Sequence, residues 1–341
     1  MREGARLADS RLLGRRFAVI ASMLLGTFLA LLSAAAQSPA KIFRVGHLAA
    51  PGRTPDGAPP RALREALREL GYVEGQNIVY EARFAEGKFE RLPDLAAELV
   101  RLNVDVIVAQ GGKSTEAARR ATTTIPIVMA PASGDAVAVG WIATLARPGA
   151  NITGLSDESI QLSSKRMELL KETLPKARSI AVLWNEADYG MTLRYREIEK
   201  AARTLHVEVQ AVSVRGPEDF AAAFATMTRR RPDAMFLVAD ALTNVNRKQF
   251  IDFAAANRIP AMYESSFIVR EGGLMSYGSN PEDEFREAAR YIDRIFKGAK
   301  PADLPAVQPT RYYLAVNRKT ATALGLTIPP TLLLRIDQLL E

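Results

Sequence analysis

Polar side chains follow five short apolar runs of the chain, at the points where buried strands would end. These are Gln110, Asp135, Asn185, Asp240 and Tyr263. In doubly wound α/β sheets, the carboxyl ends of the parallel strands form the crevice in which ligands bind. A carboxylate at such a position can pair with a ligand ammonium group. An aspartate there is also typical of a helix N-cap, so both roles stay open for Asp135 and Asp240.

The segment Val104–Thr115 indicates how one of these strand ends could bind an anion. Its first half is a β-branched run, typical of a strand that is buried on both faces. Gln110–Gly112 then interrupts the run, and an alanine-rich helix opens at Ser114. The unpaired N–H groups and the dipole of a helix start favour an anion such as a carboxylate. An ordinary capped helix remains the alternative.

The tripeptide Gly112–Ser114, Gly-Lys-Ser, looks like the end of a phosphate-binding P-loop. A P-loop also needs a glycine five positions before Gly112, and Ile107 stands there inside the predicted strand. The spacing therefore argues against a P-loop. A bound carboxylate needs only the N–H groups and a hydroxyl such as that of Ser114.

The chain offers little for catalysis or metal binding. It has no cysteine, which removes thiol nucleophiles, disulfides and cysteine-based zinc sites. Its two histidines, His47 and His206, are too few for a histidine metal site, and no G-x-S-x-G motif occurs. His47 ends a predicted strand and could line the crevice, although buried structural histidines are common. We therefore expect no enzymatic activity, no cofactor and no metal site.

Helices and strands that would position these residues alternate along the chain, which favours a parallel sheet with right-handed crossovers. The apolar periodicity predicts strands at 42–48, 78–84, 104–108, 125–129, 179–184, 207–214, 233–239 and 259–263. It predicts helices at 61–70, 88–102, 114–122, 137–145, 163–174, 192–205, 217–228, 246–257 and 282–297. The segment 274–278 looks like a return crossing, and 307–318 like one more strand before a short helix. The pattern restarts after the irregular stretch 147–154, which we expect to be a hinge between two α/β halves.

The N-terminus has the pattern of a cleaved export signal. Arg11, Arg15 and Arg16 lie just before the apolar run 17–32, and the small residues of 33–36 follow as a cleavage site. A retained anchor is the alternative, and the export route stays open. Cleavage would lower the formal net charge from +7 to +4, because 1–36 holds five Arg and two acidic residues. The remaining cationic and acidic residues alternate along helix faces, so we expect no nucleic-acid binding.

Several segments resemble the ABC-transporter substrate-binding family that includes the tryptophan/tyrosine-type (TrpX-like) proteins. Their order and spacing span nearly all of the chain that follows the export signal. The matching segments are Leu70–Ile78 (LGYVEGQNI), Arg91–Ala96 (RLPDLA), Leu145–Leu155 (LARPGANITGL), Gly272–Gly278 (GGLMSYG) and Ala323–Pro330 (ALGLTIPP).

The resemblance implies a type I periplasmic-binding-protein fold, with two Rossmann-like lobes of parallel sheet joined by a three-segment hinge. Lobe 1 would comprise 41–154 and 277–305, and lobe 2 would comprise 155–276 and 306–335. Such a protein captures a small solute, for example an amino acid or a related compound, in the interlobe cleft and delivers it to a membrane permease. It has no catalytic residues. The ligand-binding residues that the resemblance implies are His47, Gln110, Gly111, Gly112, Ser114, Ser133, Asp135, Asn185, Asp188, Asp240 and Tyr263.

The chain departs from the pattern of the family at two positions. Lys113 stands in a turn that is often Gly-Thr-Pro in relatives, and it could favour a more acidic ligand or point to solvent. Ala136 follows Asp135 where many relatives have proline, which affects only local stiffness. A sensor subunit for a membrane kinase or chemoreceptor would share the fold and the cleft. A periplasmic enzyme is a third possibility and would depend on Asp135 or Asp240, whereas the export signal argues against a transcription regulator.

Overall fold

The structure is a computed structural model that describes residues 41–341 except 53, 55 and 132–134. Residues Phe43–Glu341 form one compact unit. The predicted export signal and Ser133 lie outside the described residues. In the part of the chain that is described, no helix has the length and apolar character needed to span a bilayer.

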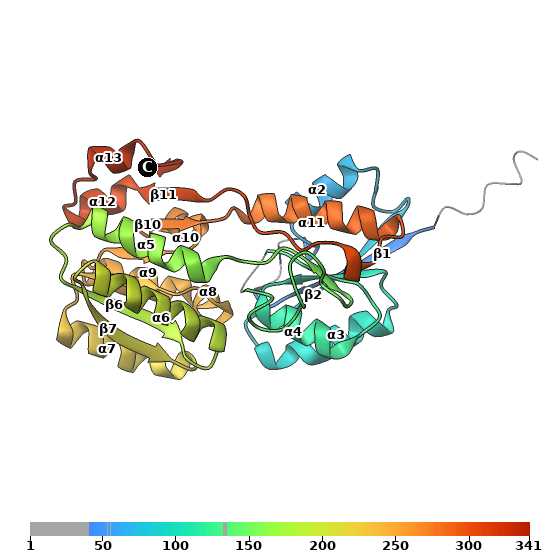
Figure 1. Cartoon of the computed structure of the whole chain (residues 1–341), viewed down its shortest axis with the longest axis horizontal. Helices are drawn as coiled ribbons and strands as arrows, with labels where there is room; N and C mark the ends of the chain where they lie inside the picture. Colours follow the sequence, from blue (N-terminus) through green and yellow to red (C-terminus); the bar gives the residue numbers. More distant parts are fainter. Residues whose placement is uncertain (1–40, 53, 55, 132–134) are drawn as a thin grey trace, which may run out of the picture. The chain divides into compact units, whose positions relative to one another are not determined.

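The first sheet has five parallel strands in the order β2-β1-β3-β4-β5. Figure 1 labels β1 and β2 of this sheet, together with the helices α2, α3, α4 and α11. These strands are β1 (Phe43–Ala49), β2 (Ile78–Phe84), β3 (Val106–Gln110), β4 (Ile127–Met129) and β5 (Ile152–Gly154). Strand β3 is apolar from Val106 to Ala109 because helices cover both faces of the sheet. On one face Ile107 packs with α3 (Leu92–Arg101) and α4 (Gly112–Ala121). On the other face Val106 and Val108 pack with α2 (Arg61–Glu69) and α11 (Pro281–Phe296).

The second sheet has seven strands in the order β12-β11-β10-β9-β8-β6-β7. They are β6 (Ser179–Asn185), β7 (Glu208–Val214), β8 (Ala234–Leu237), β9 (Ala261–Tyr263), β10 (Met275–Gly278), β11 (Tyr313–Asn317) and β12 (Gln338–Leu340). One face packs against α5 (Ser159–Thr173), α6 (Tyr189–Thr204), α12 (Arg318–Leu324) and α13 (Pro330–Leu333). The other face packs against α7 (Phe220–Arg230), α9 (Arg247–Ala256) and α10 (Ser266–Arg270).

The chain passes between the two sheets three times. It leaves the first sheet after β5, returns after β10 to form α11, and passes back before β11. The first and third passages lie side by side: the Ser156 N–H donates to the Val307 carbonyl (2.8 Å) and the Val307 N–H to the Gly154 carbonyl (3.0 Å). A hydrogen bond from the Tyr312 hydroxyl to a Glu158 carboxylate oxygen (2.9 Å) joins them as well.

Three local predictions were wrong. Residues 137–145 form turns instead of a helix, because Gly140 takes a left-handed φ of 74° after a single turn capped by Asp135. Part of the stretch expected to be an irregular hinge, Ile152–Gly154, is strand β5. The second sheet is not wholly parallel, since β10 and β11 pair antiparallel. The segment 274–278, which was expected to cross back between the two halves, is strand β10 (Met275–Gly278) of the second sheet.

Candidate functional site

A pocket of about 850 Å³ is lined by residues that follow strands of both sheets. Several helices begin at its wall, among them α4, α6, α11 and the short helix α8 (Ala241–Val245). Helix starts present unpaired N–H groups and the positive end of the helix dipole. Six cationic and six acidic residues line it among those that the structure describes. They are Lys113, Arg119, Arg120, Arg166, Arg194, Arg247, Glu116, Asp157, Asp188, Asp240, Glu264 and Glu284.

The start of α4 combines a glycine turn with the N–H groups of the first helical turn. Gly111 has φ 81° and ψ 170°, a backbone region that is essentially restricted to glycine. The first backbone hydrogen bond of α4 runs from the Thr115 N–H to the Gly111 carbonyl (3.0 Å). The N–H groups of residues 112–114 come before it and have no acceptor within the helix. Gln110, Gly111 and Gly112 line the pocket. Ser114 is fully buried and is not part of the lining.

His47 lies directly behind this turn, in the sheet. Its side chain is fully buried, and its Nε2 lies 3.2 Å from the Oε1 of Gln110. Burial lowers the pKa of His47 to about 4, although the hydrogen bond with Gln110 opposes the shift. His47 is therefore neutral at pH 7 and reaches the pocket only through Gln110, since it does not line the wall itself.

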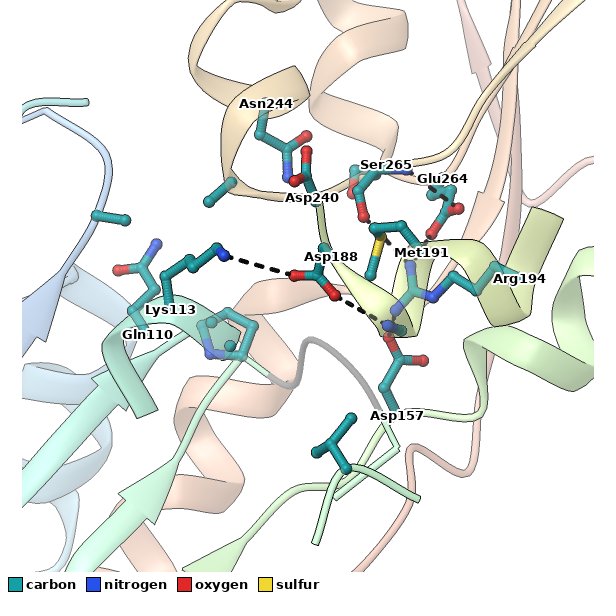
Figure 2. Close-up of a pocket in the computed structure, with 18 of the residues that line it drawn as sticks. Gln110, Lys113, Asp157, Asp188, Met191, Arg194, Asp240, Asn244, Glu264 and Ser265 are labelled. Carbon is teal, nitrogen blue, oxygen red and sulfur yellow. Dashed lines mark hydrogen bonds and ion pairs between the residues drawn. The ribbon is translucent and has the colours of Figure 1, made fainter. Parts of the chain in front are cut away.

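The start of α6 places a carboxylate opposite the start of α4. Asp188 is the N-cap of α6, and its Oδ1 accepts a hydrogen bond from the Gly190 N–H (3.0 Å). Its other oxygen lies 3.9 Å from the Nζ of Lys113, which begins α4 together with Gly112. Figure 2 shows the two side chains pointing toward one another. The pocket thus has a positive and a negative group facing each other at short distance.

Asp240 also lines the pocket, but its carboxylate already has partners. One oxygen accepts from the N–H of Thr243 (2.8 Å) in a capping box at α8, and the other accepts from the side-chain amide of Asn185 (2.7 Å). Burial raises the pKa of Asp240, and these hydrogen bonds act against that shift. Asn185 is buried behind it and is not part of the lining. The arrangement is that of a structural cap at the pocket wall.

Two other predicted residues lie away from the lining. Tyr263 was expected to line the cleft but lies in the core of the second sheet, 1% exposed. It belongs to strand β9 itself, and Glu264 and Ser265 after it reach the pocket. Asp135 accepts from the N–H groups of Val137 and Ala138 (3.0 Å each), which makes it the cap of a turn.

A group of four charged residues, three of them buried and Asp157 partly exposed, was missed from the sequence. Arg194 donates to Glu264 (3.0 Å) and to Asp157 (2.9 Å), and Arg166 lies 3.4 Å from the same oxygen of Glu264 (Figure 2 shows all but Arg166). Both arginines are only 2% exposed. The signal was available, because Arg194 occupies a helical position on the buried face of α6 that also carries Met191 and Ile198.

An indole ring forms another part of the wall. Trp141 lines the pocket and also packs against the core of the first sheet. Its Nε1–H donates to a carboxylate oxygen of Glu116 (3.1 Å). Hydrogen bonds from Arg119 and Arg120 and from Trp141 lower the pKa of Glu116 to about 2, against the effect of burial. Within the described residues no cluster of His, Asp and Glu could hold a metal ion.

Comparisons with known proteins agree with this architecture. A family model described as ABC transporter substrate binding protein matches residues 60–339. A tyrosine-binding protein of Clostridioides difficile (strain R20291) is 26% identical over 263 residues, which cover 77% of this chain and 75% of that protein.

Two solved structures are similar over 88% of this chain and 100% of their own. A conserved domain protein of Vibrio cholerae has a TM-score of 0.81 at 26% identity. An ABC domain in complex with L-Trp from Streptococcus pneumonia has a TM-score of 0.80 at 23% identity. The predicted fold of two Rossmann-like lobes, the type I periplasmic-binding-protein fold, is confirmed.

Proposed function

The chain belongs to the ABC transporter substrate-binding protein family, and from this we propose that it captures an amino acid or a closely related zwitterion and delivers it to a membrane permease. The family consists of substrate-binding proteins and not of enzymes. The ligand of this chain, its location and its docking partner are proposed here in addition to the family.

The observation that carries the proposal is the charge balance of the pocket. Equal numbers of cationic and acidic residues line it, so a ligand with no net charge leaves no charge uncompensated. Lys113 and Asp188 face each other at 3.9 Å, with the N–H groups of the α4 start beside the lysine. A bound zwitterion would exchange this ion pair for two of its own: its carboxylate pairs with Lys113 and the helix start, and its ammonium group pairs with Asp188.

Two relatives support an amino acid as the ligand class. One is described as a tyrosine-binding protein and the other was solved in complex with L-Trp. The pocket volume of about 850 Å³ is within the usual range for small-molecule sites and leaves room for a large side chain.

We further propose the location and the domain division of the protein. The N-terminal leader would be removed on export to the periplasm, where a chain without cysteine has no thiol to oxidise. Each lobe would contain one sheet, with the three passages of the chain between the sheets as the hinge. Residues 279–305 would then belong with the first lobe, because α11 packs against the first sheet.

Thermal unfolding of the purified mature chain tests the ligand class. L-amino acids that bind should raise the melting temperature, because a ligand specific for the folded state stabilises it by about 2.7 kcal/mol at 100 times its Kd. Matched analogues of a binding amino acid that lack either the carboxylate or the amine should give no rise. An absence of any shift across the common amino acids would contradict the proposal.

Substitutions at the facing charges test the orientation. Asp188→Asn keeps the side-chain oxygen that caps α6 but removes the charge, so binding of the zwitterion should weaken about tenfold or more while the helix stays formed. Lys113→Gln should weaken binding of the zwitterion as well. Arg203→Gln is the control. It breaks an exposed ion pair with Glu199 on the same helix α6, and the variant should bind normally. Normal affinity in Asp188→Asn would place the ammonium group elsewhere.

A further inference from the structure

Trp141 is held in the wall of the pocket from two sides. Its ring packs against the core of the first sheet, and its backbone N–H donates to the Ala136 carbonyl (2.9 Å). Ala136 is fixed in turn, because its N–H donates to the buried hydroxyl of Ser156 (3.1 Å). The next residue, Ile142, is 4% exposed. The indole therefore has a defined position although its segment is neither helix nor strand.

Glu116 fixes the edge of the indole ring that carries Nε1. Its carboxylate accepts the indole Nε1–H at 3.1 Å, two hydrogen bonds from Arg119 at 2.9 Å each, and one from Arg120 at 2.7 Å. The carboxylate is held in place by α4 and is ionised at physiological pH. A charge-assisted hydrogen bond of this kind is stronger than a neutral one, so the ring is held against rotation.

The indole N–H is consequently not available to a ligand. What the ring offers the pocket is its flat apolar surface, which makes its best contacts with another flat ring. The neighbouring lining residues Ala138 and Val139 are small and apolar, and they offer no side-chain hydrogen bond to a polar ligand group. This part of the wall therefore suits an unsaturated, planar group.

We propose that Trp141 selects ligands with a flat, unsaturated side chain and that Glu116 is the positioning residue that holds its ring. The inference rests on the proposed function, since it assigns the side-chain subsite of the same pocket. The zwitterion end of the ligand lies at Lys113 and Asp188, and the side chain lies on the indole.

The chain allows this contact to be observed directly. Trp184, the second tryptophan, is buried in the core of the second sheet, where it stacks on Tyr195 at 3.8 Å and does not line the pocket. Trp184→Phe keeps a ring for that stacking and leaves Trp141 as the sole tryptophan. L-phenylalanine should then change the tryptophan emission of this variant, excited where phenylalanine does not absorb.

Binding of a matched ligand pair measures the selection. L-phenylalanine and L-cyclohexylalanine share size and charge but differ in flatness, so calorimetry gives a ratio of their affinities. Trp141→Leu should lower this ratio about 2- to 10-fold, the range of one aromatic contact. Trp141→Phe should keep most of it. Glu116→Ala should lower it, whereas Glu116→Gln, which retains an acceptor oxygen, should restore most of it.

The outcomes separate this inference from the proposed function. Two results together would overturn the selection role of Trp141 and leave the amino-acid pocket standing. Trp141→Leu would still bind L-leucine and keep the unmodified ratio of affinities for L-phenylalanine and L-cyclohexylalanine. L-phenylalanine would also leave the tryptophan emission of Trp184→Phe unchanged. If neither phenylalanine, cyclohexylalanine nor leucine binds the unmodified chain, the proposed function fails. Equal loss of the ratio in Glu116→Gln and Glu116→Ala would reject Glu116 as the positioning residue.

Discussion

Asp240 and His47 both stand at the ends of buried strands, and both already have partners within the protein. Asp240 is bonded to Asn185 and Thr243, and His47 to Gln110. Polar residues at a strand end can thus support the wall of a pocket without contacting a ligand. The difference matters for mutagenesis, because such residues change stability before they change affinity.

His47 should make the free energy of unfolding depend on pH. Burial lowers its folded-state pKa to about 4, whereas an unfolded histidine has a pKa near 6.5. Between these values the unfolded chain takes up a proton that the folded chain does not. The stability that His47 contributes is therefore complete above pH 6.5 and falls by up to about 3 kcal/mol as the pH drops to 4.

Urea unfolding at pH 7 and pH 4.5 checks this dependence. His47→Gln should remove most of the difference in unfolding free energy between the two pH values that is due to this residue. His206→Gln changes an exposed histidine and should leave the difference as it is. An unchanged pH dependence in His47→Gln would mean that His47 is protonated in the folded protein.

Asp240→Ala should destabilise the fold. The change removes the N-cap of α8 and leaves the buried amide of Asn185 without its acceptor, which together cost about 1–3 kcal/mol. Urea unfolding measures the loss. Asp135→Ala removes the cap of a turn and should have a smaller effect. A stable Asp240→Ala protein that no longer binds its ligand would instead make Asp240 a ligand contact.

At the residue scale, the sequence predicted which residues lie at the pocket better than it predicted what their side chains do there. Gln110, Asp188 and Asp240 line the pocket as strand-end residues. Tyr263 does not, because it is itself the last residue of β9 and its side chain packs into the core of the second sheet. The contacts of Arg194 could not be read at all, since its partners Asp157 and Glu264 are distant in sequence.

At the scale of the element, the helix starts define the pocket. α4 begins with a glycine at its wall, so a side chain there would lie directly at the N–H groups. Gly112→Val should keep the fold, with a stability change of less than about 1 kcal/mol, and weaken ligand binding tenfold or more. Calorimetry with a binding amino acid measures this, and circular dichroism checks the fold.

Ala121→Val is the matched control, since it places the same side chain at the last residue of α4. It should bind normally. If Gly112→Val also binds normally, the start of α4 is an ordinary capped helix and does not contact the ligand.

Elements with strong local signals were predicted within a few residues. β2 has the predicted bounds, and α2 ends at Glu69, one residue before the predicted end at Leu70 and just before Gly71, a residue type that often follows a helix end. The turns at 137–145 were mistaken for a helix because apolar spacing alone does not reveal that Gly140 ends the turn. The antiparallel pairing of β10 with β11 depends on a contact distant in sequence, which periodicity does not report.

At the scale of the whole molecule, hydrogen bonds tie the passages between the sheets together. Tyr312→Phe removes the bond from its hydroxyl to Glu158 and should lower the free energy of unfolding by about 1 kcal/mol. Amide hydrogen exchange should become faster in residues 155–158. The neighbouring Tyr313→Phe removes an exposed bond to Asp283 and is the control. Equal effects of the two substitutions would show that the hydrogen bond between the passages stabilises the fold no more than an exposed one does.

The packing of α11 on the first sheet has a consequence for synthesis. Phe285, Tyr291 and Ile292 of this helix cover one face of a sheet whose strands all lie before residue 155. A nascent chain that has not yet reached residue 281 cannot cover that face, and contacts so distant in sequence form slowly. The N-terminal half therefore stays unfinished while most of the chain is being made, and its sheet is fully covered only after the last residues of α11 have been added.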